Sequence, residues 1–364
     1  MKTITQSIIR LNRIIISLLA LQLVVSAVPY ISFAQHEKAQ HGQEHSSPNE
    51  HSHHKLLQQI PIGIMGGHTH EQGSWMISYR YMFMNMDGNR IGTNSVSNQR
   101  VLEDYIVAPT NMDMQMHMFG LMYAPTDYIT LMTMIPYSII SMNHVTRSGD
   151  RFKTETKGIG DIRLTGLIKI FENANHQIHL NSGMTMPTGS INKKGDTPAG
   201  DNMQLPYPMQ LGSGTVDLLP GVTYVGMHNS LQWGTQLITT IRLGDNSRDY
   251  KLGNKIEATA WGSWNLFNWA STSLRLDWQS WGNIKGADPA LNPMMVPTAD
   301  PNLRGGNRLD ALAGLNFFVP TGPAWLRGQK IGAEFGMPAY QDLDGPQLET
   351  DWILWLGWQY VWSI

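Results

Sequence analysis

Polar and apolar residues alternate along most of the chain after residue 73, and the pattern is clearest between Met112 and Met142. Methionines fill alternate positions of its first half, while Phe119, Leu121 and Tyr123 fill positions between them. Because successive side chains of a β-strand point to opposite faces, this stretch predicts a hairpin that turns at 124–127. Each strand has about a dozen residues. That length exceeds the usual soluble strand and suits a strand tilted across a bilayer.

The same alternation predicts an all-β chain that forms a single antiparallel transmembrane β-barrel of about twelve strands. The predicted strands are 73–84, 112–124, 127–142, 158–171, 177–186, 214–226, 231–243, 255–266, 269–282, 307–318, 329–337 and 350–364. Short connections alternate with long ones, as in outer-membrane barrels, and an even strand number fits the same architecture. With the N-terminus in the periplasm, the long loops face outside. Pro136 and Pro220 fall inside strands and predict a bulge or kink at each.

Several predicted strands carry apolar residues on one face and charged residues on the other. A soluble sandwich would turn the apolar face inward, whereas a membrane barrel turns it towards lipid. Strand length, loop pattern and an export signal favour the barrel. The charged face then lines the lumen, and its candidate residues are Arg80, Asp161, Arg163, Arg275, Asp277, Asp310 and Glu334. These charges either orient water and solutes or neutralise one another between neighbouring strands.

Methionines are the most distinctive residues of the predicted lumen. The candidate lumen set is Met82, Met84, Met112, Met114, Met116, Met118, Met132 and Met134. Methionine fills irregular gaps, it lines adaptable apolar binding surfaces, and its thioether is a soft ligand that favours Cu(I). The set therefore packs the barrel wall or an inward-folded plug, forms a path for hydrophobic molecules, or binds copper, and these three interpretations stay open.

The N-terminal region separates into two parts. Residues 1–34 combine basic residues, an apolar run and a small-residue cleavage site, which is typical of an export signal peptide; an uncleaved anchor is the alternative. Residues 35–60 are polar and predict a disordered, histidine-rich periplasmic arm. Imidazole binds Cu(II), Ni(II) and Zn(II), so the arm either captures metal or is a solvated tail. The candidate metal ligands are His36, His41, His45, His51, His53, His54, His68 and His70.

Composition and motifs narrow the class of protein. A net charge of −2 gives no field that would favour nucleic acid. The chain has no cysteine, which excludes disulfides and thiolate sites. It has no Gly-x-Ser-x-Gly, His-Glu-x-x-His or P-loop motif, so the sequence predicts that it is not an enzyme. Residues 352–364 form an alternating apolar face that resembles the C-terminal recognition strand of bacterial outer-membrane proteins.

Several segments resemble one family of bacterial outer-membrane proteins. They are Gly66 to His70, Trp75 to Met86, Asp196 to Gly200, Gln204 to Leu219, and Tyr340 to Asp351. In these places the chain is similar to transporters grouped with the phenol-degradation meta-pathway family. The resemblance runs from about residue 60 to the end of the chain. It implies a β-barrel that passes small compounds, aromatic ones included, and its methionine-rich members imply heavy-metal handling.

The sequence thus predicts one porin-like barrel over residues 61–364, in the outer membrane of a Gram-negative bacterium. It predicts passive passage of small hydrophobic or aromatic solutes. Binding of copper or another soft metal by the methionine-rich strands and the histidine-rich arm is the alternative. The predicted channel requires no cofactor. In the alternative, metal-binding interpretation, the ligand is copper or another divalent metal. The expected partners are membrane lipid, a small-molecule solute and the barrel-assembly machinery, and nucleic acid is not expected.

Overall fold

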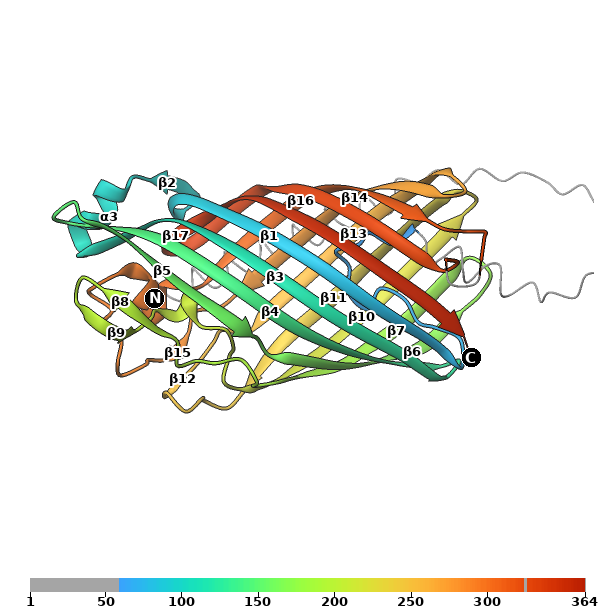
Figure 1. Ribbon diagram of the computed structural model, residues 1–364, viewed down its shortest axis with the longest axis horizontal. Helices are drawn as coiled ribbons and strands as arrows, with labels where there is room; N and C mark the ends of the chain where they lie inside the picture. The colour runs from blue at the N-terminus through green and yellow to red at the C-terminus, as the bar shows by residue number, and fades with distance from the viewer. Residues whose placement is uncertain (1–58, 324–325, 364) are drawn as a thin grey trace, which may run out of the picture. The chain divides into compact units, whose positions relative to one another are not determined.

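The computed structural model describes residues 59–323 and 326–363. Of the 13 strands in its main sheet, 11 form a closed antiparallel barrel (Figure 1). They are β1 (Ser74–Gly92), β3 (Val107–Thr126), β4 (Ile129–Thr146), β6 (Ile162–Glu172), β7 (His176–Met186), β10 (Val216–His228), β11 (Leu231–Leu243), β13 (Lys255–Phe267), β14 (Ala270–Trp281), β16 (Gly306–Phe318) and β17 (Gln329–Ser363). β17 pairs with β1 and closes the ring. Among the described residues, no helix is long and apolar enough to cross a membrane.

β17 supplies two neighbouring arms of the wall. Its first part pairs with β16 as far as Leu343, and its second part pairs with β1. The chain folds back between them, since Thr350 N donates to Gln341 Oε1 at 2.8 Å. The rings of Phe335 and Trp352 also stack, with centroids 6.0 Å apart. Counting both arms gives the predicted twelve, and the all-β antiparallel barrel is confirmed.

The remaining short strands lie outside the ring. β2 (Asn94–Val96) pairs with β1, and β5 (Arg151–Ile159) pairs with β4. β4 pairs with β5 as far as Tyr137, opposite Ile159, and with β6 from Met134, opposite Arg163. Between these two pairs, two residues of β4 face the three residues between Ile159 and Arg163. The extra residue makes a bulge opposite Pro136, as expected because proline has no backbone N–H donor. At Pro220 the register to β7 continues without a bulge.

The outer face of the wall is apolar. Phe119, Leu274 and Phe335 point outward, with 55%, 64% and 50% of their surfaces exposed. Aromatic pairs such as Trp75 with Tyr123, whose centroids lie 4.3 Å apart, add to this face. Such a surface would associate in water, whereas lipid and the membrane interface accommodate it. The outward face is therefore the lipid-facing side, as the sequence pattern predicts.

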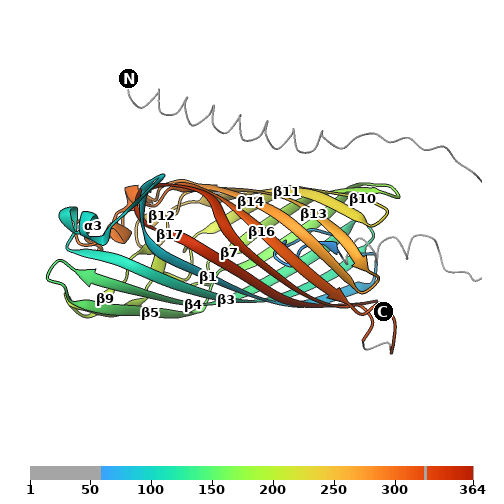
Figure 2. The ribbon, with the colours of Figure 1, turned by 90° about the horizontal axis from the view of Figure 1, so that it is seen from above.

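The connections divide the barrel into two ends (Figures 1 and 2). The end with short connections, where β1 begins, is called the turn end, and the opposite end is called the loop end. The loop end holds α3 (Asn98–Asp104), β8 (Lys194–Thr197), β9 (Gly200–Gln204), η1 (Tyr207–Met209), β12 (Tyr250–Lys251), β15 (Lys285–Gly286), η2 (Pro297–Ala299) and η3 (Pro301–Leu303). β1, β3 and β4, with 19, 20 and 18 residues, extend further into this end than predicted.

Candidate solute path

A segment before β1, residues 59–72, lies inside the barrel and is called the plug (Figure 1). Its three isoleucines, Ile60, Ile62 and Ile64, are only 3%, 1% and 4% exposed. Ile60 and Ile64 pack against apolar residues of β10 and β13, among them Trp261. The predicted disordered arm extended to residue 60, and that boundary is wrong because the side chains of Gln59 and Ile60 are buried in the lumen.

Polar side chains from strands around the ring bind the plug backbone. The contacts are Lys330 Nζ to Ile60 O, Arg80 Nε to Ile62 O at 2.8 Å, Gln236 Nε2 to Met65 O at 3.0 Å, and His179 Nε2 with Gly66 O at 2.9 Å. These four side chains come from β17, β1, β11 and β7. Since β7 and β11 lie across the ring from β1 and β17, the plug spans the lumen near the turn end.

Two glycines let the plug approach the wall closely. Gly63 N donates to Glu334 Oε2 at 2.5 Å, and a Cβ at this position would collide with Arg275 and Glu334. Gly66 has a φ of +60°, a conformation that favours glycine. A Cβ there would also lie 3.2 Å from Leu167. The plug therefore follows a path that larger residues would obstruct at both points.

The predicted lumen charges lie on inward faces, and most of them contact an opposite charge. Arg275 Nε donates to Glu334 Oε1 at 3.0 Å, and Arg275 lies 3.7 Å from Asp277. Arg308 Nε donates to Asp310 Oδ2 at 3.0 Å. The side chains of Arg275 and Glu334 are only 4% and 1% exposed. The lumen charges were predicted either to orient solutes or to neutralise one another, and these contacts favour neutralisation. Arg80 is the exception, because it binds the plug backbone.

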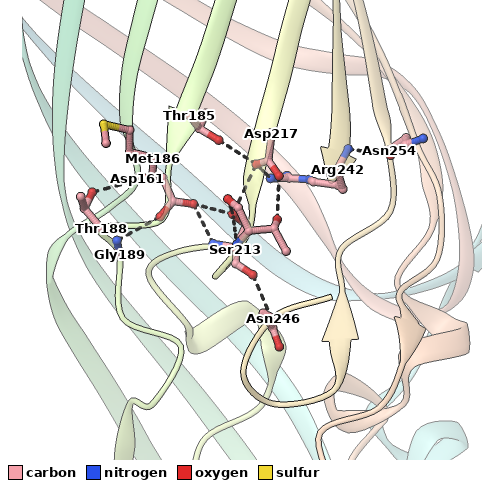
Figure 3. Close-up of polar contacts among 11 residues, drawn as sticks. Asp161, Thr185, Met186, Thr188, Gly189, Ser213, Asp217, Arg242, Asn246 and Asn254 are labelled. Carbon is pink, nitrogen blue, oxygen red and sulfur yellow. Dashed lines mark hydrogen bonds and ion pairs between the residues drawn. The ribbon is translucent and has the colours of Figure 1, made fainter. Parts of the chain in front are cut away.

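Two aspartates hold the loop between β7 and β10 in the mouth of the barrel (Figure 3). Asp161 accepts a hydrogen bond from Gly189 N at 2.9 Å. It also accepts bonds from Ser213 N and Ser213 Oγ, at 2.7 and 2.8 Å. Asp217, which forms an ion pair with Arg242, accepts a further bond from Ser213 Oγ at 3.3 Å. Asp161 is therefore a loop anchor, a role that its position on the charged face did not reveal.

Buried tyrosines join this loop to two others at the loop end. The rings of Tyr207 and Tyr250 meet edge to face, with centroids 4.9 Å apart. Tyr207 Oη accepts a bond from Asp288 N at 3.0 Å, and the Asp288 carboxylate lies 2.5 Å from Arg248. Burial raises the pKa of Tyr250 to about 12, so its hydroxyl stays protonated at neutral pH. The three loops therefore form one connected layer over the loop end.

All methionines of β1, β3 and β4 face the lumen, and together they are called the methionine wall. Its members are Met76, Met82, Met84, Met86, Met112, Met114, Met116, Met118, Met122, Met132, Met134 and Met142. Several stand directly opposite one another on neighbouring strands, as do Met84 and Met114. Met65 of the plug packs against the middle of this wall, and Met209 of η1 packs against its loop end. A row of thioethers thus runs between the plug and the layer of loops at the loop end.

No protein-family model and no curated protein matches the sequence. Among solved structures, the chain is similar to an outer membrane channel from Pseudomonas putida F1, with 16% identity and a TM-score of 0.59. That match covers 83% of this chain and 100% of the channel. The fold is that of a bacterial outer-membrane β-barrel.

Two further outer-membrane barrels match at lower similarity. A Pseudomonas aeruginosa FadL homologue has 10% identity and a TM-score of 0.36, over 79% of this chain and 89% of its own. The KdgM porin has 10% identity and a TM-score of 0.37, over 78% of this chain and 98% of its own. Only the first match is close enough to support the fold.

Only two of the eight candidate metal-ligating histidines lie in the part of the chain that the structure describes. Six of them, His36, His41, His45, His51, His53 and His54, lie outside the described residues. His68 and His70 belong to the plug, where they are 7% and 3% exposed and their rings meet edge to face with centroids 4.8 Å apart. Within residues 59–323 and 326–363, no three His, Asp or Glu side chains are placed to hold a metal ion.

Of the side chains that bind the plug, Arg80 and Glu334 were predicted to line the lumen, but the segment that forms the plug and two of its glutamine partners were not predicted. Gln177 and Gln236 carry no charge and stood out in no motif, although Gln177 Nε2 donates to Thr69 Oγ1 at 3.1 Å. One signal was present in the sequence. The apolar run from Ile60 to Ile64 lies between a polar arm and the first strand, where neither lipid nor strand pairing would bury it.

Proposed function

We propose that this outer-membrane barrel is a passive channel for small apolar solutes, aromatic ones included. The methionine wall is the observation that carries the proposal. Thioether side chains are flexible and polarisable, so they adapt to apolar molecules of different shapes. Met84, Met114 and Met116 keep part of their surface accessible on the inward face, which makes them the contact points of such a path.

The charged part of the lumen, formed by β13, β14, β16 and the first arm of β17, supports the same proposal. Most of its charged side chains form ion pairs with one another, so it offers little net electric field to attract an ion. It is not dry, because Glu257, on the inward face of β13, keeps 40% of its side chain exposed. Arg163 of β6 lies within electrostatic range of Glu257. An apolar solute would therefore move along the methionines while water remains on the charged side.

The two blocking segments make passage conditional in this proposal. A solute that enters at the loop end meets the connected loops, and one that reaches the turn end meets the plug. Passage then requires displacement of each segment, and no catalytic group takes part. The resemblance of the sequence to transporters of the phenol-degradation meta-pathway family supports aromatic compounds as the solute class.

A swelling assay with proteoliposomes tests the solute class. Phenyl glucoside is expected to enter faster than methyl glucoside, which is smaller but has no aromatic ring. Changing Met84, Met114 and Met116 together to Gln is expected to abolish the preference, because amide groups would replace the thioethers with hydrogen-bonding surface. Changing the same residues to Leu is expected to preserve it, since Leu conserves volume and apolar character.

The comparison is made in the intact chain and in a variant that lacks residues 59–70, so that slow opening of the plug does not hide the selectivity of the wall. Equal rates for the two solutes in both backgrounds would contradict the proposal. A preference that survives the Gln changes would place the solute path elsewhere in the lumen.

A further inference from the structure

We infer that the loop end of the methionine wall is a binding site for a soft monovalent cation, Cu(I) or Ag(I), formed by Met86, Met112, Met142 and Met209. Three of these side chains stand in one row across three adjacent strands. Met86 is opposite Met112, and Met112 is opposite Met142. Directly opposed residues on one face have Cβ atoms only about 4.5–5.5 Å apart. Their thioether sulfurs can therefore converge on one ion.

The fourth side chain comes from the loop that covers this row. Met209, in η1, is 0% exposed and belongs to the same buried cluster as the other three. Its backbone position is fixed, because Met209 O accepts a bond from Thr156 Oγ1 at 2.8 Å. Two strand pairings and one loop anchor thus bring four thioethers to one place.

The chemistry of this donor set selects a soft ion. Met86, Met112 and Met142 are 8%, 5% and 1% exposed, so the site is shielded from water. Thioethers favour Cu(I), whereas hard cations favour carboxylate and carbonyl oxygens. Apart from methionine, the side chains packed in this cluster are leucine and isoleucine, which offer no ligand atom. Among the described residues, no three His, Asp or Glu side chains are placed to hold a metal ion, so a hard cation has no set of oxygen ligands here.

Simple packing does not account for where the methionines occur. On β1, β3 and β4 the outward apolar positions hold Ile, Leu, Phe, Tyr and Trp, and all the methionines are inward. Leucine and isoleucine are also apolar, and Leu167 and Ile353 fill buried positions beside the methionines. The row is also repeated at the turn end, where Met76, Met122 and Met132 are opposed across the same three strands. Both features are expected when sulfur itself is required.

Competition with bicinchoninate, a chromophoric Cu(I) chelator, tests the site on the purified full-length protein under reducing conditions. Met112→Leu combined with Met209→Leu is expected to remove one bound Cu(I) per chain. Met203→Leu is the matched control, because Met203 is in the same loop and 40% exposed. It is expected to bind as much Cu(I) as the wild type. Unchanged binding in the double variant would overturn the inference.

X-ray absorption at the copper edge gives a second test that needs no variant. Sulfur is expected in the first shell of Cu(I) bound to the wild-type protein. A shell of nitrogen and oxygen alone would overturn the inference. Retention of heat-modifiable migration in gel electrophoresis shows that the variants are folded. The site does not depend on the proposed solute, and either could fail without the other.

Discussion

Deletion of residues 59–70 is expected to raise the conductance of the barrel in planar bilayers several-fold. The plug spans the lumen, and its backbone is bound by side chains of β1, β7, β11 and β17. Removing it leaves a twelve-arm ring, which encloses a wider interior than an eight-stranded barrel filled by its own side chains. Single-channel recording of the purified variant measures the change.

The deletion is expected to leave the wall folded. Arg80, Lys330 and Glu334 lose their plug partners but gain contact with lumen water, so they are not left buried without a partner. Deletion of residues 40–54 is the control, because it shortens the chain ahead of the plug and leaves residues 59–72 intact. A folded deletion variant with the conductance of the wild type would mean that another segment limits flow.

Arg275→Met is expected to lower the free energy of unfolding by about 3–5 kcal/mol, the usual loss when one partner of a buried ion pair is removed. Arg275 donates to Glu334 Oε1 at 3.0 Å, and both side chains are almost fully buried. Asp277, 3.7 Å away, also loses its counterion. Denaturant titration of the refolded barrel, followed by tryptophan fluorescence, measures the loss.

The double variant Arg275→Met, Glu334→Gln separates the ion pair from simple packing. It removes the charge left unpaired at Glu334, so it is expected to be more stable than Arg275→Met alone. Coupling of this kind is what a double-mutant cycle isolates. Additive losses from the two single changes would show that the residues do not act as a pair.

The wall of the barrel could be predicted from the sequence because two independent patterns coincide in it. Alternation with a period of two assigns each residue to a face, and it placed Phe119 and Leu121 outward and Met118 inward, as observed. The alternation of short and long connections gives the order of the arms. The loop-end parts of β1, β3 and β4 were underestimated, and β17 continues as strand through residues 338–349, where a loop was predicted. These parts are polar and lack the apolar alternation.

The plug could not be predicted in the same way. It has no period, and its partners are distant in sequence: His179 and Gln236 are brought to Gly66 only by closure of the ring. For the same reason, the inward position of the charged residues could be predicted, but their pairing could not. Arg275 and Glu334 are 59 residues apart, and nothing local distinguishes that pair from other inward charges.

A cysteine pair between the plug and the wall tests most directly whether the plug occupies and blocks the lumen. The chain has no cysteine, so an introduced pair has no competitor. A Cβ at Gly332 would lie 2.8 Å from Ile62 Cβ, so a small adjustment reaches disulfide distance. Ile62→Cys with Gly262→Cys is the control, because a Cβ at Gly262 meets no atom within 4 Å.

The measurement is the conductance of the Ile62→Cys, Gly332→Cys protein before and after reduction. The structure predicts that this pair cross-links under oxidation while the control pair does not. It also predicts that the oxidised protein conducts less than the reduced one, because the locked plug cannot leave the lumen. Failure of the pair to cross-link, or equal conductance in the two redox states, would contradict a plug that blocks the channel.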